Sequence, residues 1–98
     1  MAYSTIVGLC VLEFYLPGIQ SLKQKRGVLK PLLSRLHKTF NVSAAEVGFQ
    51  DVWQSAAIGI AVVTGSTAHA NQVVAGVVEW IEANYPDLLI TRQDVEIL

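Results

Sequence analysis

Residues 5–18 read TIVGLCVLEFYLPG, and this stretch decides the fold. Its first twelve residues are nearly all apolar and rich in β-branched and aromatic side chains, and Pro17 and Gly18 then end any regular structure. An unbroken apolar run of this kind is typical of a strand that is buried on both faces. The sequence therefore predicts a central strand of a sheet over Thr5–Leu16.

A helix is predicted over Leu22–Thr39, directly after this strand. Ser21 precedes the helix and Gln24 follows three residues later, which is the capping-box pattern: the hydroxyl accepts from a helix-start amide and the glutamine side chain reaches back. Apolar residues then recur at helical spacing and indicate the buried stripe of the helix, formed by Leu22, Leu29, Leu32, Leu33, Leu36 and Phe40.

The rest of the chain continues with further strands and a second helix. Strands are predicted over Asn41–Val47, Ser55–Val63 and Leu89–Leu98, and a second helix runs from Ser66 or Thr67 to Asn84. The order βαββαβ predicts a ferredoxin-like α+β fold, in which both helices cover one face of a four-stranded antiparallel sheet. The two most apolar strands, the first and the third, are expected at its centre. Residues 1–98 are expected to form a single domain.

Composition limits the classes of function. Seven basic and eight acidic residues give a net charge of −1, so any nucleic-acid role requires a local basic patch. Cys10 cannot form an internal disulfide, and one cysteine with two distant histidines offers no metal framework, so we expect no metal and no cofactor. The N-terminus resembles no signal peptide, and no apolar run reaches ~18 residues. We therefore expect a cytoplasmic protein that does not bind membranes.

One end of the predicted sheet gathers polar and basic side chains. The start of the first helix and the connection between the second and third strands should meet there. Helix-start amides and cationic side chains attract phosphate, and a tryptophan can stack on a base, which predicts an anion or RNA site. The candidate residues are Lys23, Lys25, Arg26, Gln50, Asp51, Trp53 and Gln54. The alternative is a solvated charged surface, with Arg26 paired to Asp51 or Glu46 and Trp53 at the edge of the core.

The open face of the sheet is a second candidate surface. Because both helices cover the other face, apolar side chains of the two central strands should remain exposed, and such patches usually mark a partner. We expect a homodimer or another protein partner on this face. The candidate interface residues are Val7, Leu9, Val11, Ala57, Ala61 and Val63.

Catalysis finds little support in the sequence. Ser21 and Ser55 lack evident histidine and acid partners, and the phosphate-binding arginine of acylphosphatases is absent from residues 17–20. Glu46 and Asp51 near Trp53 are the candidate carboxylate pair for a small hydrolytic enzyme, and a salt bridge is the simpler interpretation. We therefore expect no enzyme activity.

Several separate blocks of the chain resemble the YlxP-like family of small bacterial proteins. These blocks are SLKQKR (21–26), FNVSAAEV (40–47), QDVWQ (50–54), IGIAVV (58–63), His69 and VEIL (95–98). The resemblance covers essentially the whole chain. It implies a ferredoxin-like domain of unknown function with no enzyme activity, and some members are encoded near translation and ribosome-maturation factors. The leading hypothesis is therefore a non-enzymatic accessory factor that binds RNA or the ribosome. A homo-oligomeric interaction module and, last, a hydrolytic enzyme are the alternatives.

Overall fold

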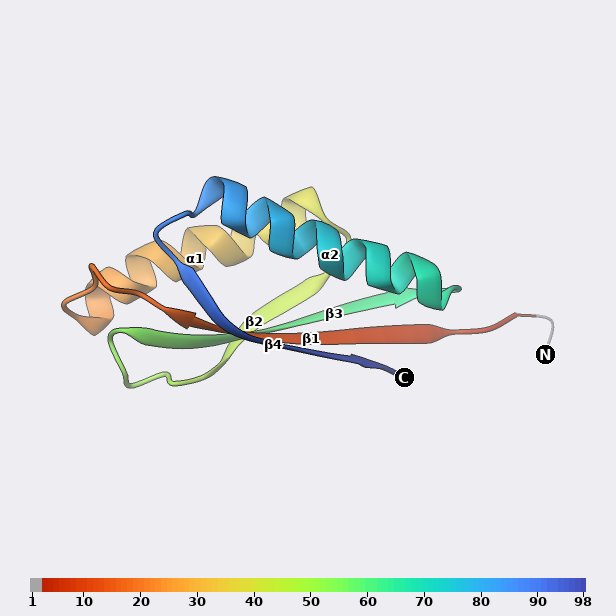
Figure 1. The fold of residues 1–98 in the computed structure, drawn as a ribbon, viewed down its shortest axis with the longest axis horizontal. Coiled ribbons are helices and arrows are strands. Elements are labelled where there is room, and N and C mark those ends of the chain that lie inside the picture. The colour runs from red at the N-terminus through yellow and green to blue at the C-terminus, as the bar shows by residue number, and fades with distance from the viewer. Residues whose placement is uncertain (1–2) are drawn as a thin grey trace.

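A computed structural model describes residues 3–98 and shows six elements in the expected order (Figure 1). The strands are β1 (Ile6–Tyr15), β2 (Ser43–Gly48), β3 (Ser55–Thr64) and β4 (Leu89–Ile97). The helices are α1 (Leu22–Thr39) and α2 (Thr67–Asn84). The strands form one antiparallel sheet in the order β2-β3-β1-β4, which confirms the ferredoxin-like α+β fold and the central position of the two most apolar strands.

The core lies between the sheet and the two helices, which cover the same face (Figure 1). Cys10, Leu12 and Phe14 alternate along β1 and are almost completely buried against the helices. The residues between them point to the other face, where Val11 is 38% exposed. The prediction that Thr5–Leu16 is buried on both faces is therefore wrong, because two helices can cover only one face of the sheet.

Local capping fixes where each helix begins. The Ser21 hydroxyl accepts from the Gln24 amide at 3.0 Å, and Gln24 Oε1 accepts from the Gln20 amide at 2.8 Å. This is the predicted capping box, with the return bond made one residue earlier than usual. Ser66 caps α2 in the same way by accepting from the His69 amide. Neither helix in residues 3–98 is long and apolar enough to cross a membrane.

The buried stripe of α1 contains one charged residue. Leu29, Leu32 and Leu36 face the sheet, and Lys25 lies one turn before them on the same stripe. Only 2% of the surface of Lys25 is exposed, the same degree of burial as the leucines around it. The fold therefore brings an ammonium group into the edge of the core, beside the connection between β2 and β3.

Candidate functional site

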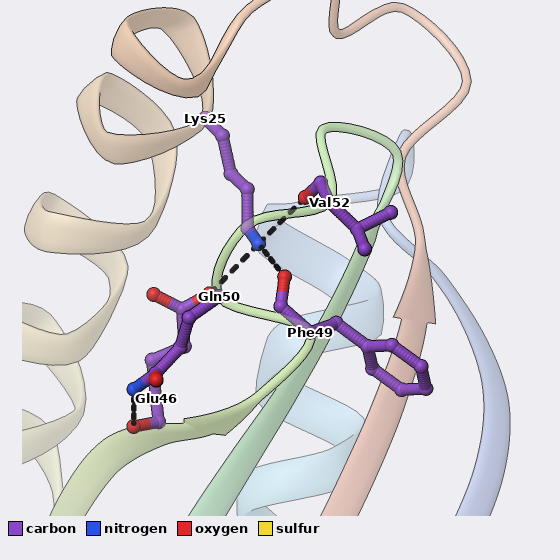
Figure 2. A network of polar contacts seen from close by, with 5 residues as sticks. All are labelled: Lys25, Glu46, Phe49, Gln50 and Val52. Atoms are coloured by element: carbon purple, nitrogen blue, oxygen red, sulfur yellow. Dashed lines mark hydrogen bonds and ion pairs between the residues drawn. The ribbon is translucent and has the colours of Figure 1, made fainter.

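Lys25 joins the first turns of α1 to the β2–β3 connection (Figure 2). Its Nζ donates to the carbonyl oxygens of Phe49 at 2.7 Å and Val52 at 2.8 Å. The same atom lies 2.8 Å from Glu46 Oε2 on β2. That carboxylate oxygen is buried and has no other partner within residues 3–98. Since an ammonium group has three donors, all of them are used inside the protein.

These contacts hold a tight turn in place. The Val52 amide donates to the Phe49 carbonyl at 3.0 Å and closes a turn over residues 49–52, so Lys25 contacts both ends of it. Gln54 anchors the end of the connection, because its Nε2 donates to the Ile19 carbonyl at 3.2 Å. Gln50 Nε2 reaches back to the Glu46 carbonyl at 3.4 Å. The connection is thus a fixed part of the fold.

The turn presents apolar side chains to solvent. Phe49 has a φ of 57°, the only positive φ at a non-glycine residue in residues 3–98, and bulky side chains rarely adopt this conformation. Phe49, Val52 and Trp53 are 45%, 46% and 52% exposed. We refer to residues 49–54 as the FQDVWQ loop. A strained and anchored loop with an exposed tryptophan is a surface that a ligand or partner can contact.

The structure brings the two predicted segments together but divides their residues into two groups. Lys25, Gln50 and Gln54 make the internal contacts described above. Lys25 therefore cannot hold a phosphate, because its three donors already have protein acceptors. This corrects its expected role, and Glu46, one of the two alternative partners considered for Arg26, pairs with Lys25 instead. The other residues of the candidate site, Lys23, Arg26, Asp51 and Trp53, are exposed.

A larger basic surface lies on α1 itself. Six of the seven basic residues of the chain fall within Leu22–Thr39, which contains no acidic residue. Five of the six are exposed, and four of these, all except Arg35, lie outside the buried stripe and span about 22 Å at 1.5 Å per residue. We call this surface the basic face of α1; it consists of Lys23, Arg26, Lys30 and Lys38. Lys30 and Lys38 lie beyond the helix start and were not among the predicted site residues, although their helical positions already place them on this face.

Arg35 has a different role from the basic face. Its guanidinium lies 4.8 Å from the centre of the Trp80 ring and donates to the Tyr85 hydroxyl at 3.1 Å. Trp80 in turn meets Phe40 edge to face, with ring centres 6.3 Å apart. These contacts connect the second half of α1 to the end of α2, so Arg35 serves packing between the helices.

The open face of the sheet carries the predicted interface residues with unequal exposure. Val63 and Val11 are 66% and 38% exposed, whereas Ala57 is only 5% exposed. Val7, Leu9 and Ala61 are partly covered by their neighbours on the same face. Leu9, Val11 and Ala61, together with Val47, which is 55% exposed, line a shallow hollow of about 190 Å³ beside Gly59. Toward β4 the face becomes charged, with Glu13, Arg92 and Asp94.

The remaining reactive groups do not form a chemical centre. Within residues 3–98, no three His, Cys, Asp or Glu side chains lie close enough together to hold a metal ion. Glu46 is paired with Lys25, whereas Asp51 lies exposed on the turn, so the two carboxylates have different environments. Burial raises the pKa of the Cys10 thiol, with a smaller contribution from nearby Asp94. A thiol of this kind is a weak nucleophile.

Comparison with known proteins finds a family match and a curated relative. Residues 7–95 match the family model described as "Protein of unknown function (DUF503)". The chain is 36% identical to Uncharacterized protein YlxP of Bacillus subtilis (strain 168) over 91 residues, which cover 91% of this chain and 98% of that protein.

Two solved structures resemble the chain in fold. One is the crystal structure of a protein of unknown function from Nitrosomonas europaea, with a TM-score of 0.55, 14% identity and coverage of 99% of this chain and 90% of that one. The other is the de novo designed protein Foldit4, with a TM-score of 0.54, 10% identity and coverage of 97% of each chain. At these identities the likeness shows the fold alone.

Proposed function

This chain belongs to the DUF503 family of proteins of unknown function, as its signature blocks predicted. We propose that it is a non-enzymatic RNA-binding protein that acts in the cytoplasm. The RNA backbone lies along the basic face of α1. The observation that carries the proposal is the separation of charge: α1 has five exposed cations, four of them on its basic face, and no carboxylate, in a chain whose net charge is −1.

Phosphate neutralisation supplies most of the affinity in this proposal. The four side chains of the basic face project from one helix at intervals of three, four and eight residues, so a single strand of about four phosphates can follow them. Each neutralised phosphate contributes to the salt dependence of binding, with a slope of about 0.7 per contact for single strands. Four contacts therefore predict a slope of about 3 in a plot of log K against log salt concentration.

The FQDVWQ loop adds a stacking surface near the start of the helix. Trp53 is 52% exposed, and Lys25 holds the loop against α1, so the indole is presented without a large ordering cost. Aromatic stacking on an unpaired base contributes about 1–3 kcal/mol. Single-stranded RNA with accessible bases is the expected ligand, because stacking requires a base outside a duplex.

The test is binding of fluorescent ribosomal RNA fragments to the purified protein across a range of salt. We expect saturable binding whose slope falls by about 0.7 for each single change Lys23→Gln, Arg26→Gln, Lys30→Gln or Lys38→Gln. Arg92→Gln is the matched control, since it removes the one Lys or Arg outside α1 and should leave the slope unchanged in dilute, monomeric protein. Unchanged binding by the fourfold variant would refute the proposal.

A second measurement examines the loop alone. Trp53→Phe should remove most of the fluorescence quenching that RNA causes, because Trp80 is packed beneath Arg35. Quenching that persists in this variant would exclude Trp53 from the site.

A protein-interaction module is the second candidate function, favoured by the exposure of Val63, Val11 and Val47 on the open face. A protein partner on this face would be insensitive to salt, unlike RNA on α1. Val63→Glu should abolish such an association and leave RNA binding intact.

A further inference from the structure

The two edge strands of the sheet, β2 and β4, differ in whether side chains form hydrogen bonds with their outward-pointing amide and carbonyl groups. At the β2 edge, His37 Nε2 accepts from the Ala44 amide at 3.0 Å, and the Ala44 carbonyl lies 3.1 Å from the same nitrogen. Further along, Gln50 Nε2 donates to the Glu46 carbonyl. Side chains from α1 and from the FQDVWQ loop therefore occupy the groups that another strand would need. This is a common way to block an edge strand.

The β4 edge has no comparable cover within residues 3–98. Val7 and Leu98 exchange hydrogen bonds of 3.1 and 2.8 Å, so they form a hydrogen-bonded pair. In an antiparallel ladder such pairs alternate, and the register opposes Leu9 to Glu96 and Val11 to Asp94. Gln93, Val95 and Ile97 alternate with these paired residues along β4, so their amides and carbonyls must point away from β1. We call these three residues the free edge of β4.

We propose that the free edge of β4 pairs with β4 of a second copy of this chain, which continues the sheet to eight strands around a two-fold axis. The charges on the strand favour a second copy over an unrelated strand. Arg92 and Asp94 lie two residues apart on the open face, with Arg92 Nε 2.8 Å from Asp94 Oδ2 in one chain. An antiparallel pair centred on Gln93 places each Arg92 opposite the Asp94 of the other copy, so the strand is complementary to itself.

A dimer formed through β4 goes beyond RNA binding by a single chain, because it fixes how two RNA-binding surfaces lie relative to each other. A two-fold axis perpendicular to the sheet leaves all four helices on one face of the dimer. Both basic faces of α1 then lie on the same side of an extended sheet, and one RNA strand can engage two of them. Linked sites of this kind raise the apparent affinity without any new contact.

The first experiment measures mass by light scattering and sedimentation up to about 1 mM chain, a concentration at which even weak dimers form. We expect twice the chain mass of 10.7 kDa. Val95→Pro should return the mass to 10.7 kDa while the chain stays folded, because the Val95 amide is not used in the β1–β4 ladder and proline is tolerated on edge strands. Val63→Glu is the matched control on the open face and should remain dimeric.

Two measurements keep the test independent of how well Val95→Pro folds. Hydrogen exchange of the unchanged chain should show the amides of Gln93, Val95 and Ile97 losing protection on dilution, while those of Asp94 and Glu96 keep it. Gln93→Cys should form an intermolecular disulfide on oxidation. The two copies of this residue lie directly opposite each other at the two-fold axis, at a Cα–Cα distance that a disulfide can bridge.

A chain that remains at 10.7 kDa at the highest concentration would overturn the proposal. A dimer that survives Val95→Pro but is lost in Val63→Glu would also overturn it and would place the interface on the open face instead.

Discussion

Replacement of Lys25 by methionine is the sharpest test of how this fold is held together. Methionine keeps the length and apolar character of the side chain, so the packing of the α1 stripe changes little. It removes the Nζ contacts to Glu46, Phe49 and Val52 at 2.8, 2.7 and 2.8 Å. The change therefore isolates the polar contribution of a residue that is 2% exposed.

The expected loss follows from the groups left without partners. Removing one member of a buried ion pair costs about 3–5 kcal/mol, and each unsatisfied buried acceptor costs about 1–3 kcal/mol. Glu46 is 23% exposed and water can reach part of its carboxylate, which favours the lower end of the range. We expect Lys25→Met to lower the free energy of unfolding by about 3 kcal/mol, which is a large share of the roughly 5–15 kcal/mol typical of a domain. For about 100 residues this lowers Tm by roughly 15 °C.

Urea denaturation followed by circular dichroism measures this loss. Lys23→Met is the matched control: it changes the same residue type two positions away, on the exposed side of α1, and should alter stability by less than about 0.5 kcal/mol. In the Lys25→Met background, Glu46→Leu should recover part of the loss, because it removes the unpaired carboxylate. A folded Lys25→Met variant that loses less than about 1 kcal/mol would show that the three contacts do not stabilise the loop.

Two further predictions concern the loop and the core. Phe49→Gly should raise the free energy of unfolding by about 0.5 kcal/mol, since glycine adopts a φ of 57° without strain. Gln50→Gly in the same turn is the control and should lower the free energy of unfolding. A loss of stability in both variants would show that the backbone of Phe49 is not strained. Cys10 should react with thiol reagents only when the chain unfolds, because it is 1% exposed. The burial that raises the Cys10 pKa favours the neutral thiol in the folded state, so its contribution to stability is complete at neutral pH and is lost as the pH rises above about 8.5, where the unfolded thiol ionises. Cys10→Ala should flatten this alkaline decline in a stability-against-pH series, and an unchanged decline would assign it to other groups.

The candidate site was only partly predictable from the sequence. Topology correctly placed the start of α1 beside the FQDVWQ loop, because the element order fixes which connections share an end of the sheet. It did not separate Lys25 from Lys23 and Arg26. Yet Lys25, Leu29, Leu32 and Leu36 follow one another at intervals of four, three and four residues, and this helical spacing already indicates a buried lysine.

Periodicity, caps and chain order determined the secondary structure and the central position of β1 and β3, and the resemblance of separate sequence blocks indicated the family. These features depend on local spacing and on the few ways in which two helices can cover a four-stranded sheet. Tertiary structure alone decided which acceptors Lys25 meets, that Phe49 takes a left-handed backbone conformation, and that side chains block the β2 edge while the β4 edge stays free within residues 3–98. Each of these features depends on atoms brought together from distant parts of the chain. Their positions follow from the packing of the whole domain, which no local pattern in the sequence encodes.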